Sequence, residues 1–274
     1  MQRRLKIGIV GCGAIGGSLA KAILKDFKAQ ARLSCLYDVE LKKSFSLVKG
    51  LCKNRGLVAQ SLADLIKESD LVIEAAAGKD SWHIAQQALR KGRSVMIMSV
   101  GGVTNRLKEL SILANRYRGK VYIPSGAISG IDALKALAAT KIRRVILTTR
   151  KHPVSFQGVK FITDKGFKLD KIKNDRLLFS GSARQAVKYF PQNINVAAIL
   201  SLAGIGQDKT IVRIIASPFT KRNIHEIEIE SLAASVKTRT ENILHPQNPK
   251  TSYLAVLSAI ATLRQILEPV RIGT

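Results

Sequence analysis

A glycine-rich segment near the N-terminus has the residue types and spacing of a phosphate-binding turn. The segment Gly11–Gly16, with sequence GCGAIG, fits the pattern G-x-G-x-x-G and lies between the apolar run Leu5–Val10 and a run with helical spacing, Ile15–Phe27. In such a turn the first glycine permits the bend, the second lets the backbone approach a pyrophosphate, and the third lets the helix pack on the strand. Backbone N–H groups and the helix dipole then hold the phosphate. The predicted cofactor contacts in this turn are Gly11, Gly13, Ala14, Ile15 and Gly16.

An acidic residue stands at the end of the next predicted strand. Asp38 closes the stretch Leu33–Asp38, twenty-two residues beyond Gly16. A carboxylate at this place accepts hydrogen bonds from the adenosine ribose and repels a 2′-phosphate, which favours NAD over NADP. Lys42 and Lys43 lie near enough to soften that repulsion, so NADP stays open. The alternative interpretation is an aspartate that only caps a turn.

Small residues, AAAG at 75–78, end the predicted strand that begins at Leu71. Ligands of open α/β sheets bind at the carboxyl ends of the strands, where small side chains let the backbone run beside the cofactor. We therefore expect Ala76 and Ala77 to contact the cofactor. The segment Ser99–Gly102 occupies the equivalent position one strand later.

Strands and helices alternate through the first part of the chain, which predicts a doubly wound parallel sheet of the Rossmann type over residues 1–124. The remaining elements expected there are strands at 94–100 and 120–123 and helices at 81–91 and 105–117. After Pro124 the pattern changes to a smaller α+β substrate domain with a mixed sheet, residues 125–248. Its expected strands are 143–150, 176–181, 209–216 and 226–231, and its helices 131–139, 183–190 and 195–204. A C-terminal helix, 249–268, is expected to pack back on the first domain.

The composition limits the classes of partner. A net charge of +26 favours anionic partners. The basic residues are nevertheless spread along the chain without blocks of like charge, and aromatic residues make up only 5%, so nucleic-acid binding is not predicted. No apolar run is long enough to span a bilayer, and the run Leu5–Val10 is interrupted by Lys6, so neither a membrane span nor a secretory signal is expected.

The three cysteines, Cys12, Cys35 and Cys52, form neither a disulfide framework nor a metal-ligand pattern. They are typical of free thiols in a reducing compartment. We therefore expect a cytoplasmic protein without a metal site.

Four histidines are candidates for acid–base chemistry, because imidazole titrates near neutral pH. His83 lies on a predicted helix and is expected at the surface, whereas His152 and His245 each precede a proline in a loop. His225 lies where a turn enters an alternating strand. Spacing alone does not choose between them.

Four further segments carry a resemblance to a known family. Their sequences are GAISGID at 126–132, FPQNINVAA at 190–198, NIHEI at 223–227 and NPKTS at 248–252. Together with the glycine turn, over nearly the whole chain, they resemble the L-aspartate dehydrogenase family. The resemblance implies oxidation of L-aspartate to iminoaspartate with NAD or NADP. The imine then hydrolyses to oxaloacetate and ammonia or feeds NAD biosynthesis through quinolinate, and a homodimer is implied.

The resemblance also implies roles for single residues. His225 matches the active-site histidine of the family, and Ala127 and Asn195 match positions near the nicotinamide. Asn195 is expected to contact the substrate as well. Imidazole could take a proton from the substrate amine or activate the water that attacks the imine carbon. The sequence does not separate these two roles.

The segment 248–252 has the residues of a helix start. Asn248 suits the N-cap and Pro249 the first helical position. Lys250, Thr251 and Ser252 at a helix N-terminus would cradle a substrate carboxylate. The alternative is a plain capped helix.

Three positions depart from the family pattern. Ser217 stands where the family commonly has Asp, His245 where a small residue usually precedes proline, and His152 where Lys-Pro-Pro is commoner. These departures leave the substrate open, and a homoserine dehydrogenase- or dihydrodipicolinate reductase-like oxidoreductase is the alternative enzyme. The alternative from another class is a Rossmann redox sensor that binds nucleic acid. It would need a recognition element such as a helix-turn-helix, and the sequence shows none.

Overall fold

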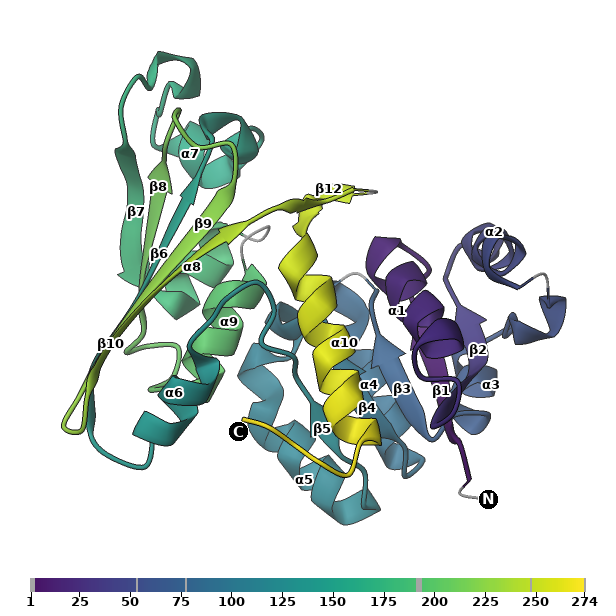
Figure 1. Ribbon diagram of the computed structural model, residues 1–274. Helices are drawn as coiled ribbons and strands as arrows, with labels where there is room; N and C mark the ends of the chain where they lie inside the picture. The colour runs from purple at the N-terminus through teal and green to yellow at the C-terminus, as the bar shows by residue number, and fades with distance from the viewer. Residues whose placement is uncertain (1–2, 53, 77, 191–193, 247, 274) are drawn as a thin grey trace. The chain divides into compact units, whose positions relative to one another are not determined.

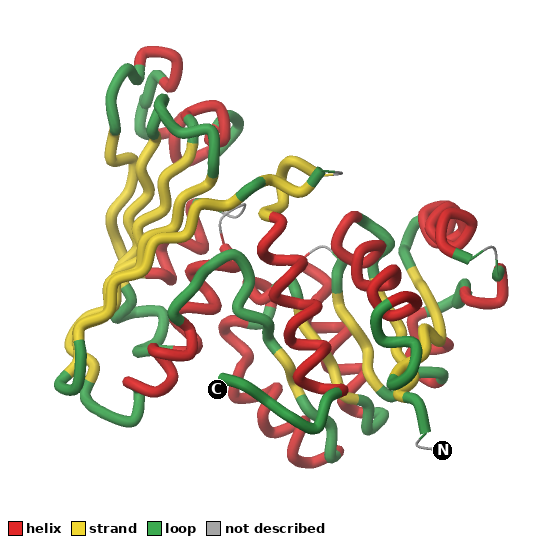
Figure 2. Tube along the Cα trace, viewed as in Figure 1, coloured by secondary structure: helices red, strands yellow, loops and turns green. Residues whose placement is uncertain are grey.

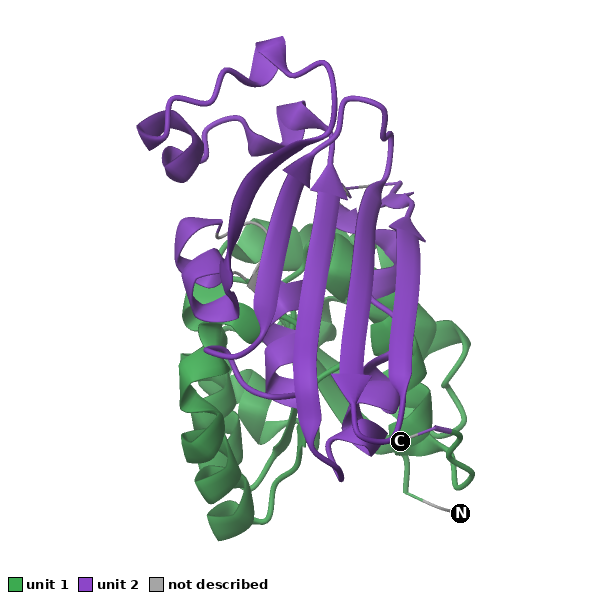
Figure 3. Ribbon diagram, turned by 90° about the vertical axis from the view of Figure 1, so that its left-hand side faces the viewer, with its two compact units in different colours: residues 1–124, 256–272 green, residues 125–255, 273–274 purple. Residues whose placement is uncertain are grey.

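The computed structural model describes residues 3–52, 54–76, 78–190, 194–246 and 248–273 (Figure 1). The chain divides into two compact units. The first contains residues 1–124 and 256–272, and the second contains residues 125–255 and 273–274 (Figure 3).

Unit 1 is built on a parallel five-stranded sheet with the strand order β2-β1-β3-β4-β5. The strands are β1 (Leu5–Val10), β2 (Ala31–Tyr37), β3 (Leu71–Glu74), β4 (Ser94–Ile97) and β5 (Val121–Tyr122). Because β1 pairs with β2 on one side and β3 on the other, the chain changes direction across the sheet at β1. In a doubly wound sheet such a switch point, at the carboxyl ends of the strands, is where ligands bind.

Among the described residues, six α-helices and four short 3₁₀ helices accompany this sheet. The last α-helix begins just before the boundary at which the chain returns to unit 1. The α-helices are α1 (Ala14–Lys25), α2 (Leu41–Leu51), α3 (Leu62–Lys67), α4 (Ser81–Arg90), α5 (Leu107–Tyr117) and α10 (Tyr253–Leu267). The 3₁₀ helices are η1 (Arg55–Leu57), η2 (Gly78–Asp80), η3 (Val100–Gly102) and η4 (Thr104–Arg106). Ala259 and Leu263 of α10 are buried in the same apolar cluster as Ile9 of β1 and Leu19 of α1. The last helix of the chain therefore completes a core that begins at its first strand.

Unit 2 is built on a mixed sheet with the order β10-β9-β6-β8-β7. Its strands are β6 (Ile142–Lys151), β7 (Arg176–Ser182), β8 (Ile211–Ala216), β9 (Asn223–Ser231) and β10 (Ser235–Asn242). Only β6 and β8 are parallel within this sheet; the other neighbours are antiparallel. Figure 3 shows the strands of this sheet side by side. The accompanying helices are α6 (Ile131–Leu137), η5 (Pro153–Phe156), α7 (Lys160–Asp164), η6 (Leu169–Lys171), α8 (Ala183–Tyr189) and α9 (Ile194–Ala203), and a small hairpin joins β11 (Leu244–His245) to β12 (Asn248–Ser252).

The predicted fold class is confirmed, since a parallel Rossmann sheet is followed by a second, mixed sheet. The prediction that the C-terminal helix starts at residue 249 is wrong. Residues 248–252 form strand β12, paired with β11, and helix α10 begins only at Tyr253 (Figure 2). Asn248 therefore caps no helix; its Nδ2 donates to Oγ1 of Thr251 at 3.1 Å within the strand. Residue types suited to a helix start are overridden here by hairpin pairing.

Strand β10 is absent from the sequence-based expectation. Its residues Ser235–Asn242 are mostly polar. The strand is marked only by the alternation of exposed and half-buried side chains in the structure. Within the described residues, no helix is both long and apolar enough to cross a membrane. The same residues contain no group of three or more histidine, cysteine or acidic side chains that could hold a metal ion.

The core role of α10 makes a prediction about stability. Leu263 is 0% exposed, whereas Leu257 on the same helix is 43% exposed. Leu263→Ala should lower the free energy of unfolding by about 2–5 kcal/mol, because it leaves a cavity in a packed core. Leu257→Ala should change it by less than about 1 kcal/mol. Urea denaturation followed by circular dichroism measures both, and equal losses would contradict the assignment of α10 to the core.

Candidate active site

The glycine turn is held by contacts that leave no room for side chains at two of its positions. Gly11 has a φ of +98°, and a Cβ there would lie 2.4 Å from the carbonyl oxygen of Ala75. A Cβ on Gly16 would lie 2.0 Å from the carbonyl oxygen of Gly11. Both glycines are therefore required by the packing of the protein itself. The turn, α1 and the end of β3 are locked together.

Gly13 is different, because a Cβ there would meet no described atom within 4 Å. It is the N-cap of α1, whose first turn has neither a capping side chain nor an acidic residue in the described structure. The first N–H groups of a helix need acceptors, and an anion can supply them. The open space over Gly13 and the uncapped helix start fit the pyrophosphate of a dinucleotide. Ala14 and Ile15 lie in the first turn of α1, where the sequence predicted contacts.

Asp38 lies directly beside this turn. Its carboxylate accepts hydrogen bonds from the backbone N–H of Cys12 at 2.8 Å and from that of Glu40 at 3.0 Å. The side chain therefore ties the end of β2 to the glycine turn, and the turn-capping role considered from the sequence is present. It is also half-buried at the carboxyl edge of the sheet, where an adenosine ribose would be recognised.

A buried acid that the sequence reasoning missed stands at the end of β3. Glu74 accepts the backbone N–H of Ala76 at 2.9 Å and that of Ser99 at 3.0 Å. Burial raises the pKa of Glu74 to about 7, against the opposing effect of these hydrogen bonds. Ala76 is thus fixed beside Ser99, at the strand ends where the sequence placed the cofactor. Ala77, its predicted neighbour in this role, lies outside the described residues. The feature of the sequence that could have pointed to this residue is that Glu74 is the single acid within the apolar run 71–77.

In unit 2, His225 lies inside strand β9 and is 4% exposed. Its Nδ1 is 3.0 Å from Oγ1 of Thr149, its partner across the sheet on β6. Burial, and next the positive charge of Lys151, lower the pKa of His225 to about 3. The ring is therefore neutral at physiological pH and can accept a proton or a hydrogen bond.

Lys151 is the second residue at this place that the sequence reasoning missed. It is the last residue of β6, two positions beyond Thr149, and so lies on the same face of the strand. It is largely buried, and burial lowers the pKa of its amine to about 8. One face of the sheet thus carries a hydroxyl, a neutral imidazole and an amine. The sequence signal was a basic residue at the carboxyl end of a strand whose centre, residues 145–147, is apolar.

The other predicted residues of unit 2 are spread over three segments. Ala127 is buried in the loop before α6, and its carbonyl oxygen accepts Nδ2 of Asn242 at 3.0 Å. Asn195 is exposed in the first turn of α9. Lys250, Thr251 and Ser252 lie in β12, so they form no helix N-terminus. Their predicted contacts with cofactor and substrate stay predictions.

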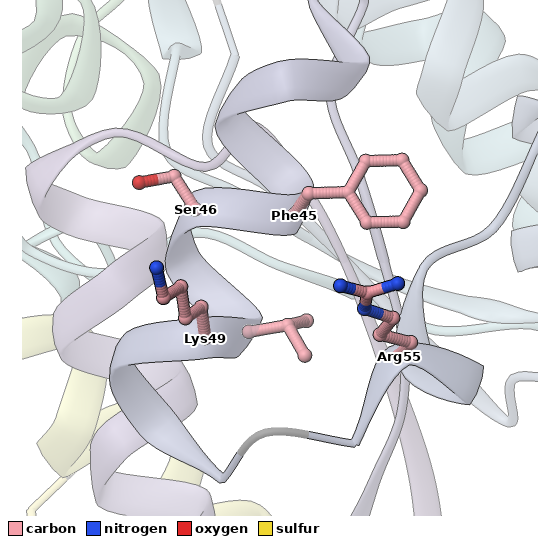
Figure 4. A pocket seen from close by; sticks show the side chains of 5 residues that line it. Phe45, Ser46, Lys49 and Arg55 are labelled. Carbon is pink, nitrogen blue, oxygen red and sulfur yellow. The ribbon is translucent and has the colours of Figure 1, made fainter.

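Two hollows lie elsewhere on the units. One, of about 800 Å³, lies on α2 and η1 and is lined by Phe45, Ser46, Val48, Lys49 and Arg55 (Figure 4). Another, of about 620 Å³, contains Arg150 and Ile224 together with Ser217. Since Arg150 and Ile224 alternate with Thr149 and His225 along their strands, their side chains lie on the opposite face of the sheet. Neither hollow includes a residue that the sequence predicted to bind or react.

Comparisons with known proteins find matches along nearly the whole chain. The model "Aspartate dehydrogenase, C-terminal" matches residues 132–266, and "Homoserine dehydrogenase, NAD binding domain" matches residues 11–124. The L-aspartate dehydrogenases of Methanosarcina mazei and Methanocaldococcus jannaschii are 46% and 39% identical to this chain, and each match covers 98% of this chain and 100% of the relative. This chain belongs to the L-aspartate dehydrogenase family.

Solved structures agree with this membership. The crystal structure of aspartate dehydrogenase from Thermotoga maritima aligns with a TM-score of 0.74 at 25% identity, covering 99% of this chain and 100% of that one. A homoserine dehydrogenase from Thiobacillus denitrificans aligns with a TM-score of 0.61 at 15% identity, covering 96% and 74%. That second likeness extends only to the fold.

The departures of this L-aspartate dehydrogenase family member from the family pattern have local structural roles. The backbone N–H of Ser217 donates to the carbonyl oxygen of Lys151 at 2.9 Å. His152 is exposed, and its Nδ1 accepts the N–H of Val154 at the start of η5. His245 is buried edge-on against the ring of Tyr253, with ring centres 5.4 Å apart. Ser217 is thus bonded to a residue on the His225 face.

The contrast between two glycines makes a prediction about cofactor binding. Gly13→Ala should fold normally, because its Cβ meets no protein atom, yet bind NAD at least about tenfold more weakly, a change of about 1.4 kcal/mol. Gly16→Ala should instead lower the free energy of unfolding by about 1–3 kcal/mol through overpacking. Calorimetry with NAD and thermal melts measure the two effects. Unchanged NAD affinity in Gly13→Ala would place the pyrophosphate elsewhere.

Proposed function

We propose that this chain catalyses the NAD(P)-dependent oxidation of L-aspartate to iminoaspartate, which hydrolyses to oxaloacetate and ammonia. The observation that carries the proposal is the match to L-aspartate dehydrogenases over 98% of the chain at up to 46% identity. The polar face formed by His225, Thr149 and Lys151 supports it, because amine oxidation needs a proton acceptor and a dicarboxylate needs a cation. A bound nicotinamide would supply the acceptor for the hydride that leaves the α-carbon.

His225 performs the acid–base step. Its Nδ1 is engaged by Thr149, so Nε2 is the nitrogen that meets the substrate. The neutral ring accepts a proton from the substrate ammonium, which must become an amine before it can lose hydride. A dicarboxylate bound nearby stabilises the imidazolium and raises its pKa from the low value of the free site. Once that proton has passed to solvent, the same nitrogen can activate the water that attacks the imine.

Lys151 binds one carboxylate of the substrate. A buried ammonium is poorly solvated, and a carboxylate gives it a charge-assisted hydrogen bond in place of water. Asn195, Lys250, Thr251 and Ser252 are proposed as further substrate contacts, as the sequence predicts. The net charge of +26 assists the approach of an anionic substrate.

NAD is the proposed cofactor in preference to NADP. A carboxylate at Asp38 repels a 2′-phosphate, and its contact with the turn at Cys12 fixes its position. Lys42 and Lys43 leave NADP as the lesser alternative.

We also propose a homodimer in the cytoplasm that serves NAD biosynthesis and does not bind nucleic acid. The free thiols Cys12, Cys35 and Cys52 suit a reducing compartment. Light scattering tests the dimer, and a salt-dependent gel shift with DNA or RNA tests the exclusion of nucleic acid.

The experiment that tests the activity follows nicotinamide absorbance with NAD or NADP and a panel of substrates. We expect reduction with L-aspartate and little with other amino acids. Turnover of homoserine or of another amino acid in place of aspartate would keep the oxidoreductase class and overturn the substrate. NAD binding without reduction across the panel would overturn the enzyme and favour a sensor.

The role of His225 predicts the effect of removing it. His225→Ala should lower kcat by about 10²–10⁴-fold, the usual contribution of a general acid–base group, and leave the Kd of NAD unchanged. His152 is an exposed histidine of the same unit, so His152→Ala is the matched control and should keep wild-type turnover. Full turnover in His225→Ala would remove this residue from the mechanism.

The role of Lys151 predicts a pH dependence. Its pKa of about 8 means that the ammonium persists below this pH and is lost above it. The KM for L-aspartate should therefore rise as the pH passes through about 8. In Lys151→Met the KM should be about tenfold higher at pH 7, equivalent to about 1.4 kcal/mol. A Lys151→Met variant with unchanged KM and a large loss of kcat would make Lys151 a proton acceptor instead.

A further inference from the structure

Glu74 connects two loops that are distant in sequence. The carboxylate is 0% exposed at the end of β3, whose other residues are all apolar. Its Oε1 accepts the N–H of Ala76, in the loop that follows β3. Its Oε2 accepts the N–H of Ser99, in the loop that follows β4. Each oxygen thus holds a different loop.

Other contacts make these two loops a single unit. Oγ of Ser99 donates to the carbonyl oxygen of Ala76 at 2.8 Å. The 3₁₀ helices that follow, η2 and η3, are also in contact, and a Cβ on Gly102 would lie 1.9 Å from the carbonyl oxygen of Gly78. No methyl group fits at Gly102, so the two loops pack backbone against backbone there. Both lie at the carboxyl ends of strands next to the switch point, where a dinucleotide runs in a doubly wound sheet.

The charge on Glu74 changes near neutral pH. Burial raises its pKa to about 7, while hydrogen bonds from Ser99, Ala76 and the backbone at Met98 act in the opposite direction. No charged side chain is among the causes of this shift in the described structure. The charged or titratable residues on the described segments in contact with β3 or η3 are Lys6, Lys79, Asp80, His83, Arg90 and Arg106.

Protonation of Glu74 alters the hydrogen bonding of both loops. An ionised carboxylate only accepts, so it satisfies both backbone N–H groups at once. A protonated carboxyl group carries one O–H donor, which opposes one of these N–H groups. A buried N–H that loses its acceptor costs about 1–3 kcal/mol, enough to favour another loop arrangement.

We propose that Glu74 is a positioning residue whose ionised form holds the loops after β3 and β4 in the arrangement that receives the nicotinamide dinucleotide, so that cofactor binding expels a proton from the protein. The inference rests on the proposed function only for the identity of this ligand. By linkage, affinity is full above the pKa of the free site and falls as the pH drops below it. At pH 6 about one molecule in ten carries the ionised form, so the apparent Kd of NAD there is about tenfold its value at pH 8.

Titration calorimetry of the whole chain with NAD tests the proposal. Measurements at pH 6, 7 and 8, in two buffers that differ in ionisation enthalpy, give both the Kd and the number of protons released. We expect a Kd about tenfold higher at pH 6 than at pH 8, and net proton release around pH 7. Equal Kd values at pH 6 and pH 8, with no proton release, would overturn the proposal before any variant is made.

Substitutions assign the proton to its residue. Glu74→Gln offers one acceptor in place of two, so it should bind NAD weakly at every pH and release no proton. Glu68→Gln, an exposed acid of the same unit, should behave as wild type. His83→Gln removes an exposed imidazole on α4, the helix that contacts both β3 and η3. Proton release that disappears in His83→Gln and persists in Glu74→Gln would overturn the proposal.

A milder variant covers the case in which Glu74→Gln does not fold. Ser99→Ala removes the hydroxyl bond to Ala76 and the side-chain hydrogen bond that lowers the pKa of Glu74, and it keeps the backbone N–H that Glu74 accepts. It should weaken NAD binding and move the pH dependence to higher pH; loss of that dependence would count against Glu74. A chain that shows proton-coupled NAD binding but no reduction with L-aspartate would fail the proposed function and leave this inference standing.

Discussion

The rest of unit 1 depends on the close approach of Gly16 to the carbonyl group of Gly11. That contact brings the axis of α1 against the turn, and the contact of Gly11 with Ala75 brings the turn against the end of β3. Asp38 then ties in β2 through the N–H of Cys12. Three neighbouring strand ends are thus fixed relative to one another by backbone packing and one carboxylate. A dinucleotide-binding edge needs this geometry before any ligand arrives.

Unit 2 has a different constraint, because its sheet buries polar groups on one face. Thr149 and His225 are buried and Lys151 is largely buried, so charge is poorly solvated at this place. As a result, the imidazole of His225 is neutral at physiological pH, and the pKa of the Lys151 amine is lowered. Burial of such groups does not stabilise a fold. Their presence on one face supports the proposed binding of an anionic, amine-bearing substrate, and the buried acid Glu74 in unit 1 supports the proposed proton-coupled binding of the cofactor.

The fold was largely predictable because its strands are short apolar runs separated by glycine turns and amphipathic helices. The prediction missed β10, whose residues are polar, and it placed a helix start on β12, where Asn248 and Pro249 imitate a cap. Of the site, the glycine turn follows from spacing, whereas His225 was chosen by family resemblance. Lys151 and Glu74 were missed because a basic or acidic residue in or just beyond an apolar run acquires its meaning only from burial. Burial depends on contacts between segments that are distant in sequence.

The placement of α10 in the first core has a consequence for how the chain is made. Residues 1–124 leave the ribosome well before the codons for Ala259 and Leu263 are translated, yet the apolar cluster around Ile9 and Leu19 is completed by these two side chains. The nascent Rossmann sheet therefore waits, with one apolar surface uncovered, while the whole of unit 2 is synthesised. Such a surface is the kind that chaperones bind. Premature termination anywhere in unit 2 leaves it permanently uncovered, so truncated chains are natural targets for quality control.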